Sequence, residues 1–525
     1  MTSACDVAII GAGHNALVAA ALLARAGLTV TVIERDDVLG GACRTEYPFA
    51  QAPRLAASTG AYLFGPFPPE LLVLLDIVPG RDLELTRRDP HYFMPTLDGR
   101  HLLLGSDQTE SRRQFAQFFT TRDARAAEAL ATEIGDIVSD VGPAWLQPVQ
   151  SVEDTAEHFV RPTLREAFVD LVRGNVVDYL SKFEFATEDV LAMYAVTDGM
   201  PGLTGSPWTP GSGHNFLVHN MCRLPGAGGT WMVAIGGMGS VTAALARTAR
   251  HAGARIVTGQ RVERILVEDG AANGVLLDSG RHLNAKVVVA GCDAFRIPGL
   301  LGDDCPPALS TQVSEWAKIS AGQTLKINLA LSGLPTFSAL ADRHGQHGTT
   351  VHLMPEHDGS ILETLRACFD GAAAGSLAPT PPLEWYLHST LDPSLRDEAG
   401  RHSSALFVQG VPHMPAGSDW ATEGPAYVER ILDLTERYAP DIRDLLVEAQ
   451  VLTPTDIESH FGITHGNIHH VNPTVSFDDR LAYALDLPGV YAASAGCFPS
   501  GSVIGAAGHN AARQILQDLQ ITVDW

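Results

Sequence analysis

The chain has 525 residues, of which 45% are hydrophobic and 18% are charged, and it carries a formal net charge of −24. This size and composition predict a globular protein of two or three domains. The acidic balance disfavours nucleic-acid binding, which needs clustered Lys and Arg, and also a polybasic grip on anionic lipid. The seven widely spaced cysteines do not resemble a disulfide framework, so we expect a reducing, cytoplasmic location.

Membrane-spanning segments are not expected. The apolar stretch 7–32 is interrupted by polar residues and has no basic region before it, so it does not indicate a signal peptide. Elsewhere no run of about 18 uncharged apolar residues occurs. The apolar segment 71–77, with Phe64 and Phe67, favours a core helix, and a membrane-facing patch is the alternative. Peripheral membrane contact and homo-oligomerisation stay open.

The first predicted unit, residues 6–35, has the pattern of a strand, a glycine turn, a helix and a second strand. Gly11 permits a tight turn, and Gly13 lets the backbone approach a diphosphate. The N–H groups at the start of the helix then face that diphosphate, and Glu34 can accept hydrogen bonds from ribose hydroxyls. This combination predicts a dinucleotide site. Its expected residues are Gly11, Gly13, His14, Asn15, Ala16, Glu34 and Arg35.

A second glycine pair, Gly40 and Gly41, follows this unit. Further along, a cap at Ser106 favours a long helix reaching residue 138, and 153–173 also has a helical pattern. The glycine-rich tract 199–229 predicts turns and loops. Later expected helices are 241–251 and 427–438, and expected strands are 256–257, 262–267, 274–277, 287–290 and 405–411. The chain closes with a strand at 490–493, a Gly/Ser turn and a helix at 506–519.

Together these motifs resemble the flavoproteins of the amine oxidase and phytoene desaturase superfamily, most closely the branch of pyridine nucleotide-disulfide oxidoreductase domain-containing protein 2. The resemblance implies an FAD whose diphosphate meets the second glycine loop and whose adenine meets the Val262 backbone. The last helix would point its positive end at the flavin ring. Further FAD contacts are implied at Gly40, Gly41, Ala42, Val262, Ser494, Ser502, Val503 and Ile504. Ala42, Ser494 and Phe498 depart from the Arg, Gly and His that are usual there.

The implied fold class is α/β, with a discontinuous Rossmann-like FAD-binding domain and a mixed sheet-and-helix substrate lobe. The FAD-binding domain would comprise 1–80, 221–300 and 481–525, and the substrate lobe would comprise 81–220 and 301–480. A second Gly-x-Gly-x-x-Gly unit for NAD(P)H is not found. A redox dithiol is not expected, because the residue five positions after Cys43 is Pro48.

The expected activity is FAD-dependent dehydrogenation or desaturation of a C–C or C–N bond in a small or lipophilic substrate. Oxygen, a quinone or another external acceptor would take the electrons. A redox-neutral isomerase and a flavin-stabilised interaction protein without turnover are the alternatives. The resemblance places 461–470 beside the flavin, with Asn467 and His470 nearest the substrate and His470 able to relay a proton. In the competing interpretation, His470 only shapes the pocket. No metal is expected.

Overall fold

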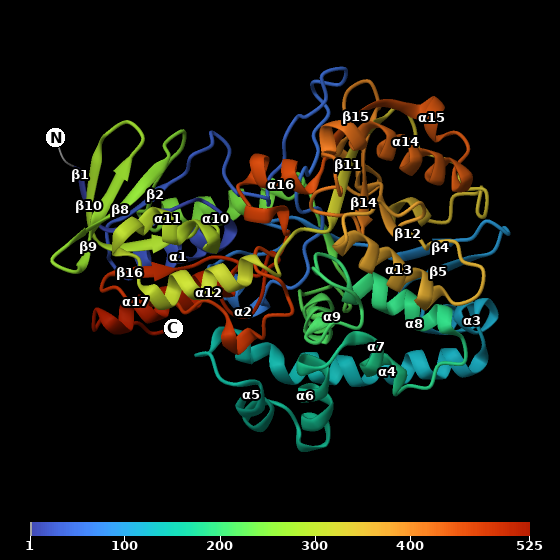
Figure 1. The fold of residues 1–525 in the computed structure, drawn as a ribbon, viewed down its shortest axis with the longest axis horizontal. Helices are drawn as coiled ribbons and strands as arrows, with labels where there is room; N and C mark the ends of the chain where they lie inside the picture. The colour runs from blue at the N-terminus through green and yellow to red at the C-terminus, as the bar shows by residue number, and fades with distance from the viewer. Residues whose placement is uncertain (1–2) are drawn as a thin grey trace.

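The computed structural model describes residues 3–525, in which two seven-stranded sheets lie side by side above a layer of helices (Figure 1). The first sheet has the order β7-β2-β1-β10-β9-β8, with β16 pairing with β10. Its strands are β1 (Ser3–Ile10), β2 (Val30–Ile33), β7 (Arg255–Val257), β8 (Val262–Glu268), β9 (Ala271–Leu277), β10 (His282–Ala290) and β16 (Val490–Ala492). Pairing among β7, β2, β1, β10 and β16 is parallel. Both faces of such strands are covered, which explains their continuous apolar runs.

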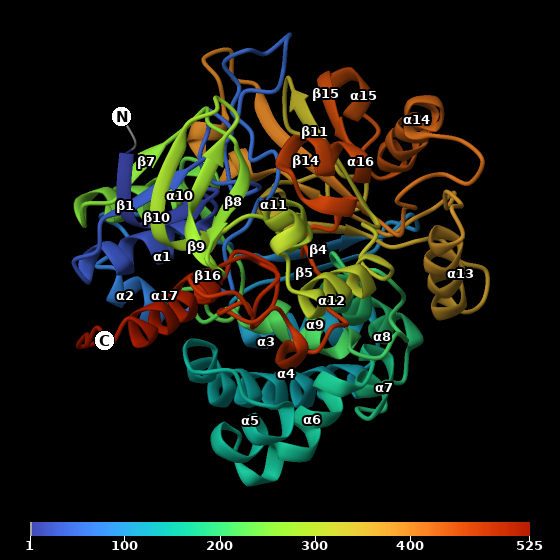
Figure 2. The same cartoon turned by 60° about the vertical axis from the view of Figure 1, so that its left-hand side comes forward.

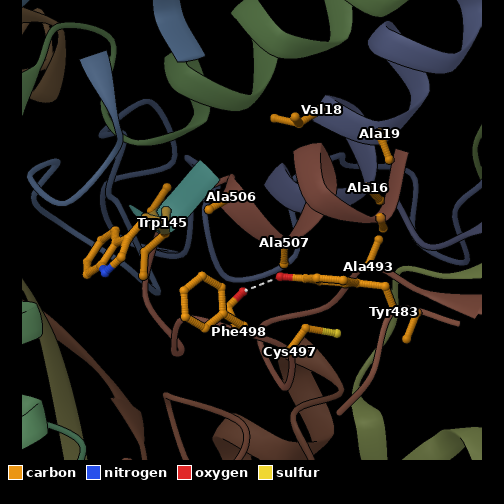
Figure 3. Close-up of a cluster of buried hydrophobic side chains, with 14 of the residues drawn as sticks. Ala16, Val18, Ala19, Trp145, Tyr483, Ala493, Cys497, Phe498, Ala506 and Ala507 are labelled. Carbon is orange, nitrogen blue, oxygen red and sulfur yellow. Dashed lines mark hydrogen bonds between the residues drawn. The ribbon is translucent and has the colours of Figure 1, made fainter. Parts of the chain in front are cut away.

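Three helices pack together beside this sheet: α1 (His14–Arg25), α10 (Gly239–His251) and α17 (Ala506–Asp518). The α1–α17 contact is close because small residues line it. A Cβ on Gly508 would lie 2.0 Å from the Asn15 carbonyl oxygen, so only glycine fits there. Figure 3 shows Ala16, Ala19 and Ala507 at this contact. The first and last segments of the chain thereby form one unit.

The second sheet has the order β15-β11-β14-β13-β12-β4-β5. Its strands are β4 (Tyr92–Pro95), β5 (His101–Leu104), β11 (Thr324–Leu331), β12 (Thr350–Leu353), β13 (Leu383–Tyr386), β14 (His402–Gln409) and β15 (Leu446–Leu452). Only the β12–β4 pairing is parallel. Leu325, Ile327 and Leu329 of β11 join the core formed with α14 (Trp420–Tyr438). Because side chains alternate along a strand, the intervening residues face the other side.

The remaining helices include a layer below both sheets, α4 to α7, which the turned view also shows (Figure 2). The helices not yet given are α2 (Pro69–Leu74), α3 (Gln108–Phe118), α4 (Thr121–Val141), α5 (Val152–Phe159), α6 (Arg165–Arg173), α7 (Val176–Ser181), α8 (Glu188–Tyr194), α9 (Ser212–Asn220), α11 (Ile297–Leu301), α12 (Pro307–Ala317), α13 (Ile361–Ala373), α15 (Ile442–Leu445) and α16 (Pro454–Phe461). A small third sheet pairs β3 (Leu85–Arg87) with β6 (Met232–Ala234).

Three sequence expectations need correction. The long helix expected to start at Ser106 is two helices, because Thr120 caps a new one by accepting from the Asp123 N–H. The first of these two helices, α3, is capped by Asp107 rather than Ser106. The helical pattern over 153–173 is interrupted around Pro162, where a 3₁₀ turn separates α5 from α6. The glycine-rich tract contains a buried helix, α9, that the turn residues concealed.

The apolar segment 71–77 is largely part of the core. Leu71, Leu72, Leu75 and Ile77 are buried, whereas Val73 is 77% exposed. Phe64 and Phe67 are also buried, so these residues do not form a membrane-facing patch. Across residues 3–525, no helix has both the length and the apolar character needed to cross a bilayer.

Candidate functional site

A cavity of about 1000 Å³ extends from the glycine turn after β1 to the polar face of the second sheet. Gly11 has φ +90°, a conformation that favours glycine. Gly13 precedes α1 and has no atom within 4 Å of the position that a Cβ would take. The backbone is therefore open to a ligand where the sequence predicts the diphosphate. The predicted residues on the cavity wall are Gly11, Gly13, His14, Asn15, Glu34, Arg35, Gly40, Gly41, Ala42, Val262, Ser502, Val503 and His470.

The start of α1 has the chemistry expected of an anion site. Gly13 provides no side-chain cap, so the N–H groups of the first turn remain available to a ligand. His14 Nε2 and Asn15 Oδ1 are buried without a hydrogen-bond partner among the described residues. Burial, with the nearby charge of His470, lowers the pKa of His14 to about 4, so its ring is neutral. The free backbone N–H groups of this turn fit a cofactor diphosphate.

Glu34 marks the nucleotide end of the cavity. It is 7% exposed, and the Ala12 and Asp36 N–H groups donate to its two carboxylate oxygens at 2.7 and 3.0 Å. These bonds hold the carboxylate at the end of β2. Val262 also lines the wall, at the start of β8. The arrangement fits an adenosine ribose, because each carboxylate oxygen can accept more than one hydrogen bond.

Three predicted cofactor contacts lie behind the wall. Ala16 packs against the segment after β10, where a Cβ on Gly291 would lie 2.6 Å from the Ala16 Cβ. Ser494 is buried and its Oγ accepts from the Gly496 N–H at 3.1 Å. Ile504 is buried in the core. These residues shape the backbone that faces the cavity, and they do not line it themselves.

The two predicted catalytic residues lie in different environments. Asn467 is 1% exposed and is absent from the wall: its amide donates to Thr204 Oγ1 and its Oδ1 accepts from the His469 N–H, both at 2.9 Å. Those bonds engage its amide in loop structure, and the placement of Asn467 next to substrate stays a prediction. His470 does line the cavity, with Nδ1 3.1 Å from Asp293 Oδ1. Asp293 follows Cys292, whose backbone N lies 3.5 Å from the Cβ position of Gly11, so His470 belongs to the diphosphate end.

The opposite end of the cavity has a polar floor that the sequence analysis missed. Strand register aligns Lys326, Phe407, Glu384 and His352 in one row across β11, β14, β13 and β12. All four line the cavity. The available signal was alternation: Thr324, Lys326 and Asn328 alternate with apolar residues in the first part of β11. Without the partner strands, this pattern could not show which residues meet.

Lys326 is the residue of this floor that is connected, through Gly60, to the second glycine loop. Its Nζ donates to the carbonyls of Ser58 and Gly60 at 2.6 and 2.5 Å and lies 4.7 Å from the centre of the Tyr62 ring. Gly60 packs on Ala42 of the second glycine loop, where a Cβ would be 2.3 Å from the Ala42 carbonyl oxygen. Burial lowers the pKa of Lys326 well below its ordinary value of 10.5. The cavity thus holds an amine that can exist uncharged.

The acidic groups on the floor are also affected by burial. Glu384 is 4% exposed and bonded to the Tyr386 hydroxyl, and burial raises its pKa to about 8. Burial likewise raises the pKa of Asp198 to about 7. The thiol of Cys43 is buried and its pKa is raised to about 12, which suits packing rather than redox chemistry.

Comparison with known proteins indicates the same cofactor as the geometry of the cavity. Residues 17–370 match the model of the family described as flavin containing amine oxidoreductase. The chain is 31% identical to mouse pyridine nucleotide-disulfide oxidoreductase domain-containing protein 2, with 98% of this chain and 94% of that protein covered. The protein belongs to the flavin-containing amine oxidoreductase family. This amine oxidoreductase-family protein is accordingly an FAD-dependent oxidoreductase of α/β fold.

More distant similarities extend over most of the chain. This chain is 25% identical to the lycopene-forming phytoene desaturase of a Paracoccus species, over 89% of this chain and 87% of the desaturase. A solved structure of putrescine oxidase bound to putrescine has a TM-score of 0.61, with 16% identity and coverage of 99% of this chain and 100% of that one. At that identity the structural likeness concerns the fold alone.

Proposed function

We propose that this protein removes a hydride and a proton across a C–C or C–N bond of a small or lipophilic substrate. The electrons would pass to oxygen, a quinone or another external acceptor. The observation that carries the proposal is one cavity joining a dinucleotide-binding end to a floor with a buried lysine. Bound FAD supplies the hydride acceptor. The chain must hold the substrate, exclude water and receive the proton.

We assign to Lys326 the role of accepting the proton that leaves the substrate. An uncharged amine has two N–H groups, which match the two carbonyl acceptors on Ser58 and Gly60, and this leaves its lone pair free. Burial lowers the pKa of Lys326 well below 10.5, which favours the uncharged form compared with an exposed lysine. His470, paired with Asp293 beside α1, is better placed to hold the diphosphate than to receive a substrate proton.

Two substitutions distinguish these roles. Lys326→Met should retain FAD and lower the rate constant of flavin reduction by roughly 10²- to 10⁴-fold. In the parent protein this rate constant should rise with pH until Lys326 is deprotonated, and Lys326→Met should remove that dependence. His470→Gln should weaken FAD binding while preserving the pH profile. Anaerobic stopped-flow spectroscopy measures the rate constant and its pH profile, and FAD titration measures cofactor binding. Loss of the pH dependence in His470→Gln, with the pH dependence kept in Lys326→Met, would return the proton-transfer role to His470.

The reaction class is tested with amines, carotenoid precursors and fatty acyl compounds mixed with the FAD-loaded protein without oxygen. Bleaching of the flavin, with a product lighter by two hydrogens, is expected for the true substrate. A product of unchanged mass would indicate isomerisation instead. Specific binding without bleaching or product would favour the interaction protein without turnover.

We also infer that 1–80, 221–300 and 481–525 act as the FAD-binding domain and that 81–220 and 301–480 form the substrate lobe. The first sheet supports this division, since its strands come from those three separate pieces. The small β3–β6 sheet links the two parts.

A further inference from the structure

Arg88 is a buried arginine that faces the cavity. Three arginines of the described chain are at most 6% exposed: Arg44, Arg88 and Arg480. Arg44 forms ion pairs with Asp36 and Glu46 at 3.1 and 3.4 Å. Arg480 directs its guanidinium at three backbone carbonyls. Arg88 alone of the three lines the cavity.

The guanidinium of Arg88 is only partly satisfied. Its Nε donates to the Trp231 carbonyl at 2.9 Å, and its Nη1 donates to Thr350 Oγ1 at 2.6 Å. Within residues 3–525, Nη2 makes no hydrogen bond and no carboxylate oxygen lies within 4.0 Å of the guanidinium. A buried charge without a partner is costly. The two fixed bonds hold the group in one orientation, with Nη2 available to a ligand.

The ionisable groups around Arg88 do not supply a permanent counter-ion. Burial raises the pKa of Glu384 to about 8 and that of Asp198 to about 7, which favours the protonated form of both carboxyl groups. His91 and His352 have lowered pKa values because of burial and the Arg88 charge, so both rings are neutral. Each also has a buried Nδ1 without a partner in the described chain. This end of the cavity has one fixed positive charge and unused polar atoms.

We propose that Arg88 binds a carboxylate group of the substrate, which makes the substrate an apolar carboxylic acid. This inference rests on the proposed function and specifies its substrate class. A carboxylate accepts a charge-assisted hydrogen bond from the free Nη2 of the guanidinium, and its single charge matches the single fixed cation. A phosphate would bring more charge than this end of the cavity offers.

The strand order of the second sheet gives the separation between Arg88, which would bind the carboxylate, and Lys326, which lies beside the reacting bond. Arg88 is bonded to Thr350 on β12, three strand positions from Lys326 on β11. At a strand spacing of about 4.8 Å, the two strands are roughly 14 Å apart. The Tyr62 and Tyr386 rings, tilted against each other with centroids 4.2 Å apart, lie along this path. The oxidised bond is therefore several carbons from the carboxylate, with an apolar chain between them.

Binding of decanoate, decanamide and decylamine to the FAD-loaded protein tests this inference by calorimetry. Decanoate should bind most tightly. Arg88→Gln should weaken decanoate binding roughly tenfold to a hundredfold, the loss expected of a charge-assisted hydrogen bond, and should leave decanamide nearly unchanged. Arg480→Gln, a control at a buried arginine outside the cavity, should not change the order of the three ligands. Tighter binding of decylamine, or unchanged decanoate binding in Arg88→Gln, would overturn the inference.

FAD content and melting temperature identify a variant that fails to fold. In that case Arg88→Lys is decisive, because it keeps the charge but lacks the Nη2 donor that the two fixed bonds orient: weaker decanoate binding supports the inference and unchanged binding overturns it. The binding measurement does not depend on turnover. Carboxylate binding without flavin reduction would contradict the proposed function alone, and flavin reduction by uncharged substrates with no carboxylate preference would contradict this inference alone.

Discussion

At the scale of single residues, Gly13 tests the predicted position of the cofactor diphosphate. Its φ is −70°, so a larger residue would not strain the backbone, and its Cβ position opens into the cavity. Gly13→Val should therefore fold but lose FAD, because the branched side chain would occupy the diphosphate space. Flavin absorbance of the purified variant measures this loss.

Gly135→Val is a matched control for that experiment. Gly135 lies on the exposed side of α4, and no atom is within 4 Å of its Cβ position. This variant should keep full flavin occupancy. Normal occupancy in Gly13→Val would show that the diphosphate is elsewhere.

At the scale of elements, Asp123 fixes the start of α4. Its carboxylate is fully buried and accepts from the Ala186 N–H at 2.6 Å and from the Thr187 N–H and hydroxyl at 3.1 and 2.6 Å. These bonds tie α4 to the segment before α8. Burial acts to raise the pKa of Asp123, but the hydrogen bonds outweigh it and lower the pKa below its ordinary value of 3.8.

Asp123→Asn should lower the free energy of unfolding by about 2–3 kcal/mol at pH 7, since hydrogen bonds to a charged acceptor are lost. A lowered folded-state pKa means that the stabilisation is present above pH 3.8 and disappears as pH falls through the folded value. The difference between variant and parent should therefore shrink in acid. Urea unfolding at several pH values measures it.

Asp107→Asn provides the control, because asparagine caps a helix about as well as aspartate. It should change stability much less than Asp123→Asn. Equal losses would mean that Asp123 acts only as an ordinary first-turn acid.

At the scale of the whole molecule, the single dinucleotide turn predicts that NADH and NADPH are poor electron donors. The sequence contains one Gly-x-Gly-x-x-Ala turn of dinucleotide type, and the structure places it at the nucleotide end of the cavity that FAD requires. NADH and NADPH should therefore reduce the flavin slowly or not at all. Dithionite should reduce it fully in the same stopped-flow experiment. Fast bleaching at micromolar NADPH would show a nucleotide site of another kind.

The sequence by itself determined the dinucleotide unit, because its signals are local. The turn around Gly11, the helix that follows and Glu34 all lie within about 30 residues, and backbone conformation dictates their residue types. The FAD assignment came from the same segments and their family resemblance. The sequence could not tell that Ala16 packs behind the wall, since a small residue suits both positions.

Only the tertiary structure decided the substrate end of the cavity. Lys326 and Glu384 are 58 positions apart in sequence, and they share a row because β14 pairs with both their strands. Arg88 and Thr350 are far apart in the sequence, and only the fold brings them within hydrogen-bond distance. Long-range strand register determines these contacts, and no local pattern encodes it. Asn467 illustrates the same limit: its short polar side chain suits a catalytic site, and only the fold shows that its amide is engaged in loop structure.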